Sequence, residues 1–191
     1  MSSSSRNTRR VDSPQRRCAL GAVLALTFAS GAALADGRHQ FVFTVYADAM
    51  GGGEIVAGHY HAALDDLRRH PGTMGPDASA TNTNRCVAYS MTRQWQEARI
   101  ACDAAVGAAT RLTRTSPAWW GWGSAPSDDY LALAYANRAV LYWLSQDSAA
   151  AQKDLAKALE LSPQSEFVAQ NVTALKAHHG LALAVASRPQ S

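Results

Sequence analysis

Apolar and small residues recur at three- and four-residue spacing through the C-terminal half of the chain, interrupted once by the polar pair Gln146–Asp147. The residues with this spacing are Val140, Leu141 and Leu144 before the polar pair, and Ala151, Leu155, Ala158 and Leu159 after it. Such spacing places apolar side chains on one face of a helix. The pattern therefore predicts two consecutive helices that pack against each other through these faces.

This pattern occurs twice, at a constant offset of 53 residues. The matching pairs are Asn84 and Asn137, Arg85 and Arg138, Val87 and Val140, Tyr89 and Tyr142, Ala98 and Ala151, and Ala105 and Ala158. Gln94 marks the turn of the first copy, as Gln146 does in the second. The chain thus contains an internal repeat, and each copy is predicted to be a helix–turn–helix unit of about 34 residues.

The second copy resembles the tetratricopeptide repeat (TPR) family. Counted from Ala132 as position 1, it fits that family's pattern at positions 4, 8, 11, 20, 24, 27 and 32, with Tyr135, Ala139, Tyr142, Ala151, Leu155, Ala158 and Pro163. Counted from Ser79, the first copy fits with Tyr89, Ala98 and Ala105 and departs with Asn82, Cys86, Cys102 and Thr110. Small residues at positions 8, 20 and 27 let two helices approach closely. The resemblance implies an all-α fold, a short right-handed α-solenoid of antiparallel helix pairs.

We divide the chain accordingly. A TPR-like helical domain is expected at 58–180, with repeats at 79–112 and 132–165, an insertion at 113–131 and a capping helix at 164–179. A tail follows at 181–191. Residues 36–57 form an extended or degenerate segment. Within it, Phe41–Tyr46 favours an extended conformation, and the glycines at 51–53 disfavour a helix. A solenoid needs a cap to cover its exposed end, which is the role assigned to the last helix.

Residues 1–35 are typical of a cleavable secretory signal. Five arginines precede a run of seventeen uncharged residues, and the sequence Ala-Leu-Ala ends at Ala35. A basic segment, a short apolar run and a small-residue site define such signals. We predict cleavage between Ala35 and Asp36 and export, to the periplasm if the host is Gram-negative. The alternative is a retained membrane anchor, but the run is short for a bilayer span, and none is expected after cleavage.

Charge excludes one class of partner. The chain has 18 Lys and Arg against 15 Asp and Glu, a formal net charge of +3, but the leader holds five of the arginines and one aspartate. The remaining 156 residues carry 13 basic and 14 acidic groups. This near-neutral remainder lacks the cluster of Lys and Arg that a nucleic-acid-binding face needs, so no nucleic-acid partner is expected.

Three asparagines are the most informative polar residues. Asn84, Asn137 and Asn171 all fall at position 6 of successive first helices, counted in the TPR register. The resemblance implies that this face lines a concave groove for an extended peptide, and a carboxamide can both donate to and accept from a peptide unit. The same register adds Val87, Ser90, Val140 and Trp143 to the groove. The alternative is that each asparagine only satisfies a neighbouring helix end.

Two further features leave alternatives open. Trp119, Trp120 and Trp122 lie within four positions in the insertion and form either a contact loop for a partner or a plug over the helices. Cys86 and Cys102, at positions 8 and 24 of the first repeat, are the two cysteines that remain after cleavage. They either form a disulfide, as an oxidising compartment favours, or remain small apolar core residues.

Catalytic chemistry finds little support. His59, His61 and Asp65 could contribute metal ligands, but His59 and His61 would point apart on a helix. Nucleophile, phosphate-binding and zinc-protease motifs are absent from the sequence. We assign no catalytic or metal-ligating residue and expect no cofactor. The sequence therefore predicts an exported adaptor that binds a protein or peptide. The alternatives are a metal-dependent or hydrolytic periplasmic enzyme and a structural homo-oligomer.

Overall fold

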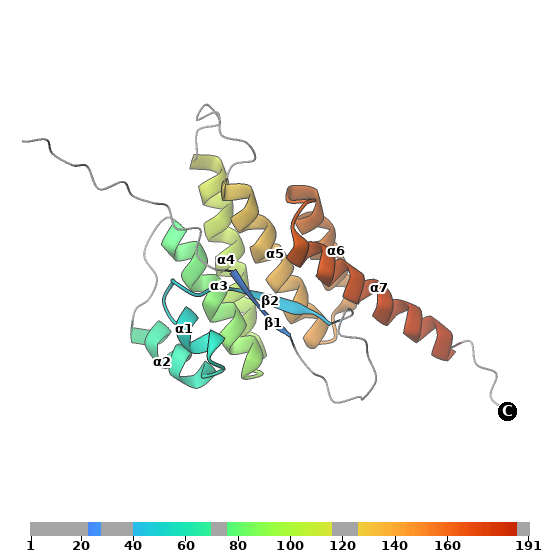
Figure 1. The fold of residues 1–191 in the computed structure, drawn as a ribbon, viewed down its shortest axis with the longest axis horizontal. Helices are drawn as coiled ribbons and strands as arrows, with labels where there is room; N and C mark the ends of the chain where they lie inside the picture. The colour runs from blue at the N-terminus through green and yellow to red at the C-terminus, as the bar shows by residue number, and fades with distance from the viewer. Residues whose placement is uncertain (1–22, 28–39, 70–75, 116–125, 187–191) are drawn as a thin grey trace, which may run out of the picture.

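The computed structural model describes residues 23–27, 40–69, 76–115 and 126–186, and these residues are mostly helical (Figure 1). They form two strands and seven helices: β1 (Val23–Thr27), β2 (Val42–Tyr46), α1 (Gly52–Val56), α2 (Tyr60–Arg69), α3 (Pro76–Met91), α4 (Trp95–Thr115), α5 (Pro126–Leu144), α6 (Ser148–Leu161) and α7 (Glu166–Ala186). The predicted all-α class is confirmed, with the addition of a two-stranded antiparallel sheet, β1–β2.

Two helical hairpins, α3–α4 and α5–α6, have the same turn. Arg93 in the first turn and Gln146 in the second have left-handed backbone φ angles of 58° and 68°. In each turn, the amide of the next residue bonds the carbonyl five residues earlier: Gln94 to Tyr89 at 3.0 Å, and Asp147 to Tyr142 at 2.8 Å. This bond satisfies a carbonyl at the helix end. Arg93 and Gln146 are also 53 residues apart, so the sequence repeat is accompanied by a structural one.

Helix boundaries differ from the predicted ones. Helices α3 and α5 begin at Pro76 and Pro126, earlier than the predicted starts at Ser79 and Ala132. Proline suits the first position of a helix, where its missing N–H costs nothing. Both flanks of the predicted insertion are therefore helical, and residues 116–125 lie outside the described part of the chain. Helix α7 continues to Ala186, so most of the predicted tail is helical.

The glycines at 51–53 do not exclude a helix, because α1 begins among them. Gly51 takes a left-handed φ of 72° just before α1. A Cβ on Gly52 would lie 2.7 Å from the carbonyl oxygen of Ala47 and closer still to that of Tyr46. The absence of a side chain at Gly52 thus lets α1, a helix of only five residues, pack against the end of β2.

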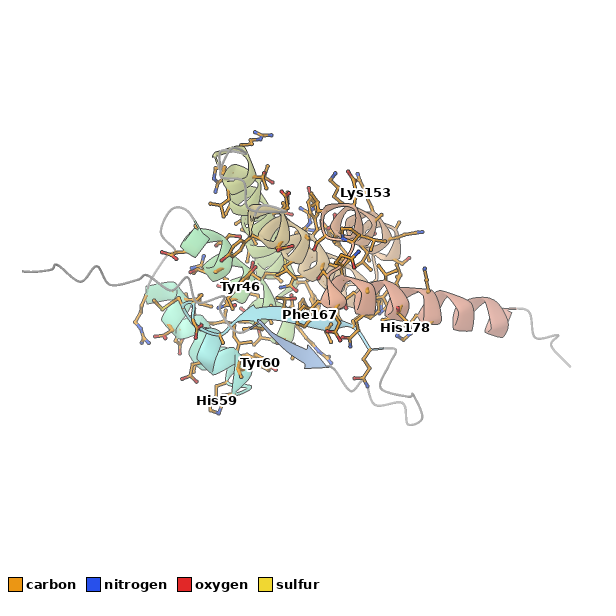
Figure 2. All side chains as sticks on the ribbon, turned by 45° about the horizontal axis from the view of Figure 1, so that its top comes forward. Tyr46, His59, Tyr60, Lys153, Phe167 and His178 are labelled. Carbon is orange, nitrogen blue, oxygen red and sulfur yellow. A yellow bond between two sulfur atoms is a disulfide. The ribbon has the colours of Figure 1, made fainter. Side chains whose placement is uncertain are left out.

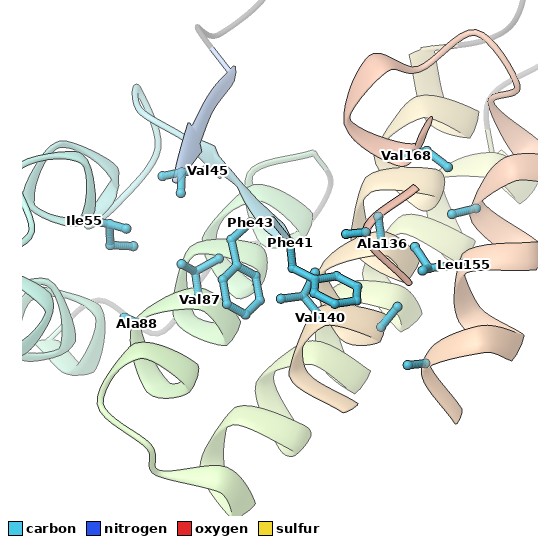
Figure 3. Close-up of a cluster of buried hydrophobic side chains, with 14 of the residues drawn as sticks. Phe41, Phe43, Val45, Ile55, Val87, Ala88, Ala136, Val140, Leu155 and Val168 are labelled. Carbon is cyan, nitrogen blue, oxygen red and sulfur yellow. The ribbon is translucent and has the colours of Figure 1, made fainter. Parts of the chain in front are cut away.

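Strand β2 crosses the helices rather than running beside them. It contacts α3, α5 and α7, the first helix of each hairpin and the helix that follows both (Figures 1 and 2). The side chains of Phe41, Phe43 and Val45 belong to one buried cluster with Ile55 of α1 and apolar residues of α3 and α5 (Figure 3). The main core therefore lies between β2 and the helices that it crosses.

Gly52 and its neighbour Gly53 allow a direct test of this packing. Gly52→Ala should lower the free energy of unfolding by about 1–3 kcal/mol, because the new methyl group meets backbone atoms at the end of β2. Gly53→Ala is the control, since a Cβ there meets no atom within 4 Å. It should leave stability unchanged or raise it by about 0.5–1 kcal/mol. Urea unfolding of both variants measures the difference, and equal effects would contradict the described contact.

Candidate functional site

Asn84, Asn137 and Asn171 each hold one residue of β2 through two backbone hydrogen bonds. The amide Oδ1 accepts from the strand N–H, and Nδ2 donates to the carbonyl of the same residue. The pairs of distances are 2.8 and 3.0 Å for Asn171 with Val42, 2.7 and 2.8 Å for Asn137 with Thr44, and 2.9 and 2.8 Å for Asn84 with Tyr46. We call these three residues the asparagine ladder.

The ladder holds the backbone rather than the side chains of β2. In a strand, the N–H and C=O of one residue point to the same side, and those of the next residue point to the other. The asparagines therefore contact every second residue, along one edge of β2. Asn84 Nδ2 also donates to the carbonyl of Met50 at 3.1 Å, which ties the turn after β2 to α3. Such contacts would accept any extended chain whose side chains fit between the helices.

The sequence predicts that the asparagines line an open groove. In the structure they do not, because β2 covers them. Asn84 and Asn171 have 0% of their surface exposed, and Asn137 has 1%. The predicted occupant was a separate peptide, whereas the structure has a segment of the same chain in that position. The prediction of an open groove at these positions is wrong, and each asparagine is instead a buried polar group whose side chain has two backbone partners on β2.

The other predicted groove residues have mixed roles. Val87 and Val140 are buried in the cluster that contains Phe41, Phe43 and Val45. The ring of Trp143 stacks on Phe41, with ring centroids 5.0 Å apart. Ser90 differs from these, because its hydroxyl donates to the carbonyl of Cys86 in the same helix, at 2.7 Å. Val87, Val140 and Trp143 therefore help to hold the segment that contains β2.

Aromatic contacts secure both ends of this segment. At one end, His178 of α7 stacks on Phe41 with centroids 5.7 Å apart and contacts Trp143 at 5.2 Å. At the other, Tyr46 stacks on Tyr130 of α5 at 5.3 Å. Burial raises the pKa of the Tyr46 phenol well above its ordinary value, and Tyr130 and Asp129 raise it further. The phenol therefore stays neutral. Figure 2 shows His178 and Tyr46 toward opposite ends of β2.

Arg138 connects the helices behind the ladder. It donates to Asp154 of α6 at 2.7 and 3.0 Å and to Asp103 of α4 at 2.8 Å. Its guanidinium also lies over the rings of Tyr135 and Tyr142, 5.3 and 5.8 Å from their centroids. Burial lowers its pKa, but the bonds to the two aspartates outweigh this and raise it. This permanently charged group fixes α5, and with it the neighbouring Asn137, between α4 and α6.

Cys86 and Cys102 form a disulfide that joins α3 to α4. Their sulfur atoms are 2.01 Å apart, their Cα atoms 4.7 Å apart, and both residues are buried. The two alternatives from the sequence were a disulfide and a pair of free thiols, and the structure has the disulfide. It links the two helices of the first hairpin, two residues away from Asn84 on α3.

The remaining predicted residues are not part of this site. Trp119, Trp120 and Trp122, together with the cleavage site at Ala35 and Asp36, lie outside the described residues. His59 Nδ1 lies 3.0 Å from Glu54 Oε2 at the protein surface. Within residues 40–69, 76–115 and 126–186, no three His, Cys, Asp or Glu side chains come together as a potential metal site.

A surface hollow of about 390 Å³ lies where the turns of the two hairpins meet. Its lining residues are Trp95, Gln96, Arg99, Leu141, Ser145 and Asp147. Arg99 and Asp147 face each other there with 3.9 Å between Nη2 and Oδ2. Both side chains are about half exposed, at 58% and 44%, so this ion pair is screened by water. The hollow is separate from the asparagine ladder.

Comparison of the chain with models of protein families, with curated protein sequences and with solved structures gives no match. None of the helices in the described residues is both long enough and apolar enough to cross a membrane.

Sequence reasoning found the asparagines but missed their partner. The sequence predicts an extended conformation for Phe41–Tyr46, but it does not predict that the backbone of this segment contacts the asparagines. The segment does carry a signal for a strand, because all six of its residues are aromatic or β-branched, but this signal does not indicate what the strand would contact. His178 was also missed, since a histidine in a helix carries no signal for stacking on a distant phenylalanine.

Removal of the central asparagine should destabilise the protein. Asn137→Ala leaves the N–H and C=O of Thr44 buried without partners and should cost about 2–4 kcal/mol of unfolding free energy. Asn82→Ala is the control, because the side chain of Asn82 accepts a hydrogen bond from Arg85 of the same helix and is partly exposed. It should cost less than about 1 kcal/mol. Chemical denaturation gives both values, and a loss in Asn137→Ala no greater than that of the control would contradict the role of the ladder.

Reduction of the disulfide should also lower stability. The cysteines are 16 residues apart, and closing a loop of that size contributes about 3 kcal/mol in the chain-entropy description. Thermal unfolding with and without dithiothreitol measures the effect. The double variant Cys86→Ala/Cys102→Ala is the control, and its Tm should not respond to the reductant. A wild-type Tm that is equally insensitive would show that the bridge contributes nothing.

Proposed function

We propose that this chain is an exported, TPR-like protein-binding module without catalytic activity. Its helices would form a short right-handed solenoid of two full helix pairs, α3–α4 and α5–α6. The shorter pair α1–α2 would be a degenerate unit at one end, and α7 would be the cap at the other. Residues 1–35 would be removed on export, to the periplasm in a Gram-negative host.

Three features support a TPR-like solenoid. The two hairpins repeat with the same turn geometry, and Ala139, Ala151 and Ala158 are fully buried where α5 meets α6. The third is the strand itself. Two residues of a strand span about 6.6–6.8 Å, whereas packed helix axes lie about 8–10 Å apart. The asparagine amides must therefore converge toward β2, as they would on the inner side of a curved row of helices.

The asparagine ladder is the observation that carries the functional proposal. It binds an extended backbone through paired donors and acceptors, which is the chemistry of peptide recognition rather than of catalysis. Because the chain's own strand occupies the ladder, a partner would bind around β2 rather than in its place. The exposed side chain of His178, which stacks on Phe41 and contacts Trp143, lies at one end of this region.

Site-specific photocrosslinking in the exporting host tests this proposal. A benzophenone amino acid at His178, beside the end of β2, should crosslink to one distinct protein. The same amino acid at Lys153, which lies exposed on α6 and away from β2, is the control (Figure 2). We expect an adduct from position 178 and none from position 153. Identical adducts from both positions, or no adduct from either, would contradict a binding surface around β2.

A further inference from the structure

Strand β2 has two edges, and both are occupied in this chain. The asparagine ladder bonds the inner edge, and β1 pairs antiparallel with the outer edge. The paired residues are Val23 with Tyr46, Leu24 with Val45, Ala25 with Thr44, Leu26 with Phe43 and Thr27 with Val42. Strand β1 lies within residues 1–35, the segment predicted to be cleaved on export. The outer edge is therefore covered by a part of the chain that export would remove.

The register fixes which backbone groups the outer edge presents. The N–H and C=O of Val42, Thr44 and Tyr46 point to the asparagines. Those of Phe43 and Val45 therefore point to β1, because successive residues of a strand alternate. In an antiparallel pair, opposed residues of this kind exchange two hydrogen bonds. Leu24 with Val45, and Leu26 with Phe43, are then the bonded pairs.

We infer that the outer edge of β2 is a strand-addition site, which β1 occupies before processing and an extended aliphatic segment of a partner protein occupies afterwards. This inference rests on the proposed export of the chain. A bare strand edge presents unpaired backbone groups and readily accepts another strand. Here the edge belongs to a strand that is fixed along its other side by six hydrogen bonds, so little ordering would be needed on binding.

The sequence of β1 indicates the chemistry of the partner segment that would replace it. Strand β1 has the sequence Val-Leu-Ala-Leu-Thr, five residues without charge. The residues of β2 that it covers are also uncharged, and Phe43 and Val45 are completely buried. A partner segment would therefore be extended, antiparallel to β2, at least five residues long and composed of small and aliphatic residues. A charged segment would lose hydration in this position without gaining a partner.

A synthetic peptide of residues 22–28 with two C-terminal lysines and a fluorescent label provides the probe. It is titrated into the processed protein purified after export, and fluorescence anisotropy reports binding. We expect saturable binding of one peptide per chain. N-methylation at Leu24 and Leu26 removes the two N–H groups that donate to β2 and should weaken binding at least about tenfold. N-methylation at Val23 and Ala25, whose N–H groups point away from β2, is the matched control and should change Kd less than about threefold.

Hydrogen exchange gives a second measurement. The peptide should slow exchange at the amides of Phe43 and Val45. It should leave Thr44 unchanged, because that amide bonds Asn137 throughout. No saturable binding, or equal weakening by both methylated peptides, would overturn the strand-addition site. A processed chain that sediments as a dimer and excludes the peptide would also overturn it, since a second copy would then occupy the edge.

The outcomes separate this inference from the proposed function. An exported protein whose intact mass includes residues 1–35 would keep β1 in place and overturn the exchange of strands. A distinct crosslink from position 178 would still support a protein-binding module in that case. Peptide binding with the expected methylation pattern, together with no crosslink from position 178, would support the strand-addition site and contradict binding of a partner beside α7.

Discussion

The carboxamide of asparagine both donates and accepts, and the fold depends on this property at three positions. Asn84, Asn137 and Asn171 each satisfy the N–H and C=O of one residue of β2, in a region from which water is excluded. A buried strand edge needs partners for every such group, and no apolar side chain could supply them. Aspartate would lack the donor and lysine the acceptor. The asparagine ladder is therefore what allows the buried edge of β2 to lie across the helices.

This arrangement changes how a repeated helix pair is stabilised. Helix pairs in a row normally contact only their immediate neighbours. Here β2 contacts α3, α5 and α7 at once, and Phe43 and Val45 of β2 join the preceding Phe41 in the main core. Arg138 and the disulfide add local contacts between neighbouring helices. The strand therefore links units that helix packing alone would connect only in sequence.

Local patterns in the sequence were enough to predict the repeat and the helices of its two copies, although not their exact ends and not α1. The spacing of Leu155 and Ala158 and the turn at Gln146 involve residues that are close in sequence. The offset between Asn84 and Asn137 is found by comparing the two copies directly. The partner of the asparagines could not be predicted in this way, because Asn171 and Val42 are 129 residues apart. Each side of the contact was visible, as an ordered set of polar residues and as an extended segment. Nothing local indicated that the two would meet.

The direction of β2 has a consequence for how the chain folds. The strand begins at the last helix and ends at α3, so the earliest described residue of the ladder contact, Val42, pairs with the latest, Asn171. A chain that is synthesised or exported with its N-terminus first must form α7 before this contact can form. Contacts between distant residues slow folding, because the loop entropy is lost before the contacts form. The helix pairs would then lock together in a single late step, and the protein would unfold as one cooperative unit rather than repeat by repeat.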